Sequence, residues 1–541
     1  MFGWICSCSE FKSHHLYIQI IKVMQIINSK SPDTTVLTPE KVTTQKSFDS
    51  FLTKFKNTLT AVFHEDNDID QLSIQRGLPA EVWQKIMSSN PLSLCIPSEY
   101  GGRGGNVQEN LTLLSAASYE SLALSLTIGI NSALFLQPVA KYGQENVKSS
   151  VFNRFLMKHN MGGLMITEPD YGSDALNMQT SYVEEKDHYH IRGTKHWAGL
   201  TGLADYWLLT ARKQATDGNL QRDVDLFVCD NKAPFQKVVV DEYFENLGLY
   251  QIPYGRNILD VQIPKLQRLE PKTTGVQMLL DLLHRSRMQF PGIGLGFIQR
   301  MLDEAITHCQ NRFVGGKSLF SYDQVQEQLS SLQANYTVCS ALCTKSSELA
   351  DIHNDLMPLG FEANIIKTVS SDLMQKSAQT LMQLVGAIGY RLNHIAGRGI
   401  VDSRPFQIFE GANDILYTQI SESLIKFMKS VKEINVWEFL KNHPLTLRAV
   451  EYLKELLNFN IDLQMPQRKL VDLGKALSRI VSMDLVIKMG ENGFRMDLVD
   501  GAVSMLRQEI SHLMDTFSFK QNTLVVENYE VDSAWANLAT T

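Results

Sequence analysis

The sequence predicts an α+β protein in which helices come first, a block of strands follows, and helices then return. Three observations support this prediction. Apolar residues recur at helical spacing up to about residue 160, short alternating or β-branched runs replace them up to about residue 271, and long amphipathic stretches follow. The strands are not interleaved with helices, and no GxGxxG motif follows a strand. A doubly wound dinucleotide-binding sheet is therefore not expected.

These patterns divide the chain into five parts. They are a leader (1–45), a helical domain (46–160), a strand domain (161–271), a helical bundle (272–429) and a helical extension (430–541). Within the extension, residues 468–490 are strongly amphipathic and predict a helix. The leader holds an apolar run of about a dozen residues that includes Lys22, which is too short and too polar to span a membrane. We expect it to be poorly ordered. The last dozen or so residues of the chain also look frayed.

Targeting signals are not recognised in the leader. It lacks the basic start and small-residue cleavage site of a secretory signal and is poor in arginine for a mitochondrial transit peptide. We expect a cytoplasmic protein, with an organellar copy as the alternative. No transmembrane segment is predicted elsewhere in the chain.

Composition narrows the function classes. A chain of 541 residues with 44% hydrophobic and 20% charged residues can build a sizeable core. A net charge of −7 argues against nucleic-acid binding, because proteins that bind nucleic acids normally present a basic face. The seven cysteines are scattered without paired CxxC motifs, so we predict no zinc site and no disulfide framework.

Two motifs in the strand domain are candidates for ligand contact. In "MITEPDYGSD", Thr167 ends an apolar strand, and a tight turn at Gly172 and Ser173 can present main-chain N–H groups to a ligand. In "RGTKHWAG", Trp197 lies at the end of a strand, while His196 is assigned no role. The plain alternatives are a polar turn and an ordinary core tryptophan.

The helical bundle carries the remaining candidates. Arg285 and Arg287 precede a helix start that is rich in glycine, and a solvated basic face is the plain alternative for these two arginines. The small residues of that helix start permit close approach by another helix or by a ligand. The stretch "FQIFEGANDIL" places Glu410 beside Ile408 and Phe409. Desolvation there would raise its pKa and make it a stronger base, although a helix cap or an ion pair would also explain a lone glutamate.

Taken in order, these motifs resemble the acyl-CoA dehydrogenase family of flavoproteins over about residues 48–429. The resemblance rests on "SLCIPSEYGGRGG", "ITEPDYGSD", "GTKHWAGLTGLADYWLLTAR", "QLVGAIGY" and "SRPFQIFEGANDI". It implies an N-terminal helical domain, a middle β-barrel-like domain and a C-terminal four-helix bundle. FAD would lie between the last two domains, with a second subunit completing its site.

The resemblance also implies a reaction, the α,β-desaturation of an acyl-CoA thioester. Glu410 falls at the position of the base that removes the α-proton, and hydride passes from the β-carbon to the flavin. An electron-transfer flavoprotein or a similar acceptor would reoxidise the flavin. A homodimer is expected, because residues 430–541 resemble the extra helical domain of very-long-chain members. Membrane contact is not indicated there, and a solvated packing domain is the simpler interpretation.

Further site residues follow from the resemblance, position by position. The implied FAD contacts are Ile166, Thr167, Gly172, Ser173, Trp197, Gly199, Arg312, Gln383, Gly386, Ala387 and Asn413. The implied substrate contacts are Ser173, His284, Arg287 and Gly411.

The sequence departs from the family pattern at three places. Gly199 stands where the family often has a threonine that bonds the flavin, so that contact is expected from the main chain or from Thr201. Gly315-Gly316 replaces the usual "FG", and Ala412 replaces the threonine after the base and its glycine. None of these changes touches Glu410.

Three other functions stay open on the sequence alone. They are desaturation of an acyl chain on a carrier protein, a flavin monooxygenase on the same fold, and a non-catalytic scaffold whose helical extension is the working part. The acyl-chain pocket is expected to be lined partly by residues 121–135, and the preferred chain length is not readable from them.

Overall fold

The computed structural model describes residues 39–519, 524–529 and 531. The chain divides into two compact units, residues 1–53 and 54–541, and the described part of the first lies within helix α2 (Pro39–Thr60). The predicted leader falls largely on residues 1–38, outside the described residues, and α2 begins inside its predicted range. Most of the final dozen residues also lie outside the described residues.

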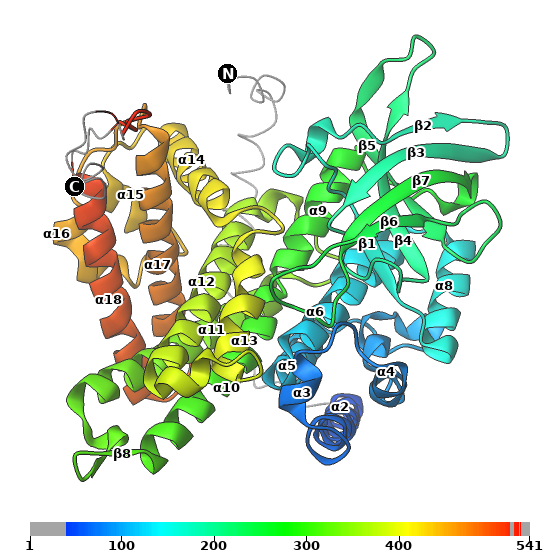
Figure 1. Ribbon diagram of the computed structural model, residues 1–541. Helices are drawn as coiled ribbons and strands as arrows, with labels where there is room; N and C mark the ends of the chain where they lie inside the picture. The colour runs from blue at the N-terminus through cyan, green and yellow to red at the C-terminus, as the bar shows by residue number, and fades with distance from the viewer. Residues whose placement is uncertain (1–38, 520–523, 530, 532–541) are drawn as a thin grey trace. The chain divides into compact units, whose positions relative to one another are not determined.

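Short helices form the N-terminal domain of the second unit (Figure 1). They are α3 (Ile69–Ser73), α4 (Ala80–Met87), α5 (Val107–Glu120), α6 (Leu122–Asn131), α7 (Gln137–Tyr142) and α8 (Glu145–Lys158). Ser121 begins α6 by accepting a hydrogen bond from the Leu124 N–H on its side chain. All ten residues of α6 are buried. The helical run Leu122–Tyr142 is long and apolar enough to cross a bilayer, but 94% of its apolar window is buried inside the protein.

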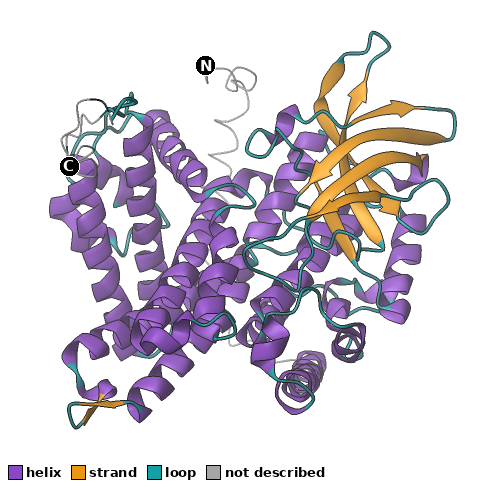
Figure 2. Ribbon diagram, viewed as in Figure 1, coloured by secondary structure: helices purple, strands orange, loops and turns teal. Residues whose placement is uncertain are grey.

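A curled seven-stranded sheet forms the middle domain (Figure 2). Its strands are β1 (Gly162–Met165), β2 (Ser181–Glu184), β3 (His188–His196), β4 (Tyr206–Gln214), β5 (Leu220–Asp230), β6 (Val239–Tyr243) and β7 (Gly255–Pro264). Their order is β1-β4-β2-β3-β7-β6, with β5 also on β4. β1 and β2 run parallel to β4, and the other pairs are antiparallel. Burial alternates along β7, as expected for a strand with one face on a core.

The C-terminal domain is a helical bundle. Its helices are α9 (Gly275–Arg287), α10 (Phe290–Asn311), α11 (Asp323–Leu349), α12 (Gly360–Val385), α13 (Ile395–Ser403) and α14 (Asn413–Val431). Helices α10, α11 and α12 pack on one another, and α14 packs on α12 (Figure 1). This arrangement confirms the predicted α+β class.

The glycines at the start of α10 let neighbouring helices approach. A Cβ on Gly296 would lie 1.8 Å from the Ser115 carbonyl oxygen of α5, and one on Gly294 would lie 3.2 Å from Cys339 Sγ of α11. Of the two partners the sequence left open here, a helix or a ligand, the structure has helices.

This close contact predicts a loss of stability when a side chain is added. Gly296→Ala should lower the free energy of unfolding by about 1–3 kcal/mol, because α5 and α10 must separate. Gly501→Ala in another helix is the matched control, since a Cβ there meets nothing within 4 Å. It should gain about 0.4–1 kcal/mol. Denaturant midpoints measure both values, and equal effects would contradict this packing account.

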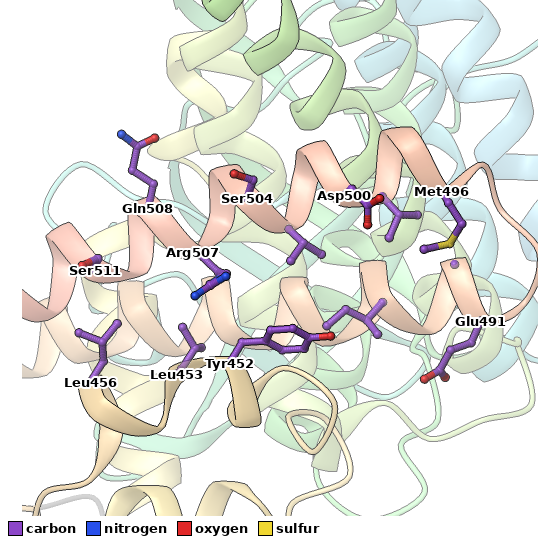
Figure 3. Close-up of a pocket in the computed structure, with 14 residues that line it drawn as sticks. Tyr452, Leu453, Leu456, Glu491, Met496, Asp500, Ser504, Arg507, Gln508 and Ser511 are labelled. Carbon is purple, nitrogen blue, oxygen red and sulfur yellow. The ribbon is translucent and has the colours of Figure 1, made fainter.

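In its described residues, the extension adds the helices α15 (Val436–Leu440), α16 (Lys454–Leu457), α17 (Gln467–Glu491) and α18 (Met496–Ser518). The predicted amphipathic helix at residues 468–490 is α17, which packs on α14 and α18. A groove of about 620 Å³ runs between α17, α18 and the segment around Tyr452 (Figure 3). None of the predicted site residues lines it.

Candidate active site

Glu410 lies in a short loop between the 3₁₀ turn Arg404–Gln407 and α14. Its φ angle is +54°, a left-handed conformation that is uncommon outside glycine and is concentrated at functional sites. Gly411 follows at φ +95°, where an added Cβ would lie 2.8 Å from Leu416 Cδ2 and 3.2 Å from Arg287 Nη2. Glycine is therefore the residue that fits beside Glu410.

The Glu410 carboxylate is enclosed and only partly hydrogen-bonded. Ser286 Oγ donates to Oε1 at 2.7 Å, while Oε2 is buried without a hydrogen-bond partner. Burial raises the pKa of Glu410, and the Ser286 hydroxyl and the charges of Arg287 and Lys367 partly offset that rise. The sequence placed this residue between apolar neighbours but did not single out Ser286.

Arg287, at the end of α9, holds the main chain of the same loop. Its Nε donates to the Glu410 carbonyl oxygen at 3.0 Å, and Nη1 donates to Asn364 Oδ1 at 2.7 Å. Burial lowers the pKa of Arg287 to about 10, so the side chain stays charged at neutral pH. Arg285 and Arg287 are both buried, so the alternative of a solvated basic face is wrong.

His284 lies one turn earlier on α9. Its Nδ1–H donates to the Leu356 carbonyl oxygen at 2.8 Å, and its ring lies against Gly360. Burial, followed by the charge of Arg287, lowers the pKa of His284 to about 4, so the imidazole is neutral at pH 7.

Lys367 of α12 holds the same loop, and it was not among the predicted site residues. Its Nζ donates to the Gly411 carbonyl oxygen and to Asn413 Oδ1, both at 2.8 Å. Burial lowers the pKa of Lys367 to about 7, and the nearby charge of Glu410 opposes that shift. The one available signal was a lysine inside the apolar run "ANIIKTV". Asn413, predicted to contact the cofactor, is buried. Its side-chain amide donates hydrogen bonds to neighbouring polar side chains of α12.

A buried ion pair fixes the loop after β1. Lys195 Nζ donates to Glu168 Oε1 at 2.9 Å and to the Ile166 carbonyl oxygen at 3.2 Å. Lys195 is fully buried, which lowers its pKa to about 8. The Thr167 carbonyl oxygen accepts the His196 N–H at 2.8 Å. Neither Glu168 nor Lys195 was among the predicted site residues.

The turn beyond this loop is open. Gly172 and Ser173 are exposed, and a Cβ on Gly172 would meet nothing within 4 Å. Its main chain is accessible to a ligand.

Trp197 forms an exposed aromatic surface at the end of β3. Its side chain is 55% exposed, its φ is +55°, and its ring lies 4.6 Å from Phe244 and 6.2 Å from Tyr254 between centroids. The alternative of an ordinary core tryptophan is therefore wrong. A large exposed aromatic face backed by two more rings suits a planar ligand.

Gly199 packs against the N-terminal domain, where an added Cβ would lie 2.9 Å from Ile130 Cδ1 of α6. Thr201, one of the two expected replacements for the missing threonine, is fully buried and donates to the Ala198 carbonyl oxygen at 2.7 Å. Its hydroxyl is therefore unavailable, and the main chain is the remaining candidate.

The segments that carry Trp197 and Glu410 are both hydrogen-bonded to one loop of the middle domain, residues 249–255. The Trp197 and Leu200 N–H groups donate to the Gly255 and Pro253 carbonyl oxygens. Just before them in the chain, the Leu249 N–H donates to Asp402 Oδ1 at 2.6 Å. Because Asp402 is on α13, which leads directly to the Glu410 loop, the two halves form a continuous structure.

Arg312 and the segment Gln383 to Ala387 lie elsewhere. Arg312 is exposed at the end of α10, and Gln383, Gly386 and Ala387 are exposed at the end of α12. Gln383 is about 24 Å along α12 from Lys367, taking 1.5 Å per residue. The end of α12 therefore lies away from Glu410 in the single chain, and the FAD contacts implied for this segment and for Arg312 stay a prediction.

Comparison with known proteins identifies the family. Three family models match consecutive parts of the chain, the N-terminal (52–158), middle (163–261) and C-terminal (273–425) domains of acyl-CoA dehydrogenase. The chain belongs to the acyl-CoA dehydrogenase family.

Individual acyl-CoA dehydrogenase relatives are distant. An acyl-CoA dehydrogenase of Bacillus subtilis is 24% identical over 64% of this chain and 90% of its own. The human mitochondrial very long-chain specific enzyme is 23% identical over 68% of this chain, and the match spans 56% of its length.

Solved structures of the family share the fold. A glutaryl-coenzyme A dehydrogenase in complex with glutaryl-CoA matches at a TM-score of 0.62 and 23% identity, over 70% of this chain and 95% of its own. A Bacillus anthracis acyl-CoA dehydrogenase complexed with FAD matches at 0.69 and 17%, over 90% of this chain and 89% of its own. The second match must include part of residues 430–541, which the family models leave out.

One departure from the family pattern has a local structural reason. Gly315 and Gly316, at φ +56° and +78°, form the two-residue turn between β8 (Phe313–Val314) and β9 (Lys317–Ser318). Two consecutive positive φ angles are typical of the tight hairpin turn that glycine favours.

Proposed function

We propose that this protein is an FAD-dependent acyl-CoA dehydrogenase in which Glu410 removes the α-proton of the thioester. The observation that carries the proposal is the enclosed carboxylate, with one oxygen held by Ser286 and the other, Oε2, buried and free to accept a proton. Membership of the family supports the reaction class.

The residues fit a flavin. Trp197 offers an exposed ring, the Ile166–Thr167 loop is rigidly held, and the main chain at Gly172 is accessible. When bound, FAD supplies the acceptor for the hydride that leaves the β-carbon. The proposed contacts are those that the family resemblance implies, including Arg312, Gln383, Gly386 and Ala387 from a second subunit. The structure with FAD among the relatives supports this cofactor.

The protein's own groups have separate tasks in this account. Arg287 and Lys367 hold the carbonyl groups of Glu410 and Gly411, and neither donates a hydrogen bond to the Glu410 carboxylate. The main-chain N–H of Glu410 would polarise the thioester carbonyl, which makes the α-proton more acidic. A bound acyl chain would expel water from the carboxylate and raise its pKa further, which brings it closer to what a general base needs.

The proposal also includes two partners. An electron-transfer flavoprotein or a similar protein would accept the electrons, and the protein would act as a homodimer. Both rest on the family resemblance.

The test is an anaerobic titration of the purified, flavin-loaded protein with acyl-CoAs of graded chain length. We expect one length class to bleach the visible flavin absorbance. Bleaching only by acyl carrier protein thioesters would replace acyl-CoA by a carrier-linked substrate. Purified protein that binds no flavin would contradict the proposal and favour a scaffold.

A further inference from the structure

Asp372 of α12 connects the two ends of the Glu410 loop, residues 408–412 between the 3₁₀ turn and α14. Its Oδ1 accepts hydrogen bonds from Gln407 Nε2 and Asn413 Nδ2, each at 2.8 Å. These two residues lie three positions before and three positions after Glu410. One carboxylate, whose side chain is 21% exposed, therefore ties together the residues on the two sides of the loop.

The counter-ion of Asp372 comes from the C-terminal extension. Arg479 of α17 donates from Nη2 to Asp372 Oδ2 at 2.9 Å and from Nη1 to the Tyr417 hydroxyl at 3.0 Å. Tyr417 itself donates to Asp372 Oδ2 at 2.5 Å. Among the described residues, Arg479 is the one cation within ion-pair distance of Asp372, and its side chain is 11% exposed.

Close packing sets the position of Arg479. A Cβ on Gly474 would lie 2.1 Å from the Tyr417 carbonyl oxygen, so α17 approaches α14 at backbone distance. Ser421 Oγ of α14 donates to the Leu470 carbonyl oxygen at 2.6 Å one turn before. These contacts leave α17 little freedom to slide along α14.

The contacts continue from Asp372 to the base. Asn413, held by Asp372, accepts a hydrogen bond from Lys367 on its Oδ1, and Lys367 also donates to the Gly411 carbonyl oxygen. Removal of Arg479 would leave the half-buried Asp372 carboxylate without its cation, and the carboxylate would then be protonated or more fully hydrated. Either change weakens its hold on Gln407 and Asn413.

We propose that Arg479 is a positioning residue through which the C-terminal extension holds the Glu410 loop in its catalytic conformation. The inference rests on the proposed role of Glu410 as the base. It gives residues 430–541 a part in the chemistry without any contact to the substrate.

The test compares Arg479→Met, Arg479→Lys and a matched control, Lys488→Met. Lys488 lies on the same helix and also ties the extension to the bundle, through Glu348 of α11 at 2.7 Å, but it does not contact Asp372. The first readout is amide hydrogen exchange of residues 405–416 in the full-length protein. Arg479→Met should speed exchange there, Arg479→Lys should restore part of the protection, and Lys488→Met should leave it unchanged.

The second readout is anaerobic flavin reduction by acyl-CoA. A misplaced base should lower the limiting rate by roughly ten- to a hundredfold for Arg479→Met, with little change in the half-saturating concentration or the flavin content. Adding Arg479→Met to Asp372→Asn should cost little more than Asp372→Asn alone, because both act through one contact.

Two outcomes would overturn the inference. They are unchanged exchange at residues 405–416 in Arg479→Met, or equal effects of Arg479→Met and Lys488→Met on the limiting rate. If no acyl-CoA reduces the wild-type flavin, the proposed function fails, while the exchange measurement still decides whether Arg479 holds the loop.

Discussion

Glu410→Gln is expected to slow flavin reduction by acyl-CoA by about 10²- to 10⁴-fold, the range attributed to a positioned general base. Glutamine has nearly the same shape and can still accept the Ser286 hydrogen bond, so flavin content should not change. Stopped-flow absorbance under anaerobic conditions measures the rate. Glu422→Gln, an exposed carboxylate on α14, is the matched control and should react like the wild type.

The same substitution should raise the melting temperature at neutral pH. Burial raises the pKa of Glu410 above its ordinary value of 4.5. Keeping the Glu410 carboxylate ionised in the folded protein therefore lowers the free energy of unfolding. The stability linked to this group is fully present below the unfolded-state pKa and is lost as pH rises through the folded-state pKa. The gain from glutamine should therefore disappear as the pH is lowered below about 4.5. A variant less stable than the wild type at pH 7 would contradict the buried-carboxylate account.

Lys195→Met is expected to cost about 3–5 kcal/mol of unfolding free energy, because it leaves Glu168 buried without its cation. The Ile166 carbonyl oxygen loses a donor as well, so the loop beside Trp197 should loosen and flavin content should fall. Chemical denaturation gives the free energy, and the ratio of visible to protein absorbance gives the flavin content.

Lys213→Met is the matched control for that change. Lys213 lies on β4 of the same sheet and pairs with Glu184 at 3.0 Å, but both side chains are exposed. An exposed pair contributes about 0–1 kcal/mol. The double variant Lys195→Met with Glu168→Gln should recover part of the lost stability. A loss of unfolding free energy in Lys195→Met no larger than that in Lys213→Met would contradict the proposed importance of the buried ion pair.

The sequence predicted much of the fold because its periodic signals were long. The glycine-rich start of α10 and the amphipathic α17 are both found as predicted. By contrast, the short runs that predicted the strand domain did not include β2, because "SYVE" is four residues long and buries one side chain, Tyr182. A run this short carries too little alternation to be distinguished from a turn.

The candidate site was predictable only in part. Ordered motifs led to Glu410 and Trp197, but the supporting residues depend on contacts between distant parts of the chain. Lys367 and Gly411 are 44 residues apart, and Arg479 and Asp372 are 107 apart. Local patterns hold no information on such pairs, so Lys367, Asp372 and Arg479 became visible only in the folded structure.

The central claim is that the enclosed carboxylate of Glu410 takes the α-proton in the step that reduces the flavin. The most direct test is single-turnover flavin reduction with acyl-CoA deuterated at the α-carbon, compared with ordinary acyl-CoA, across a pH series. We predict a several-fold slower reduction with the deuterated substrate and a rate that falls on the acid side as Glu410 becomes protonated. Equal rates for both substrates at every pH would contradict the claim.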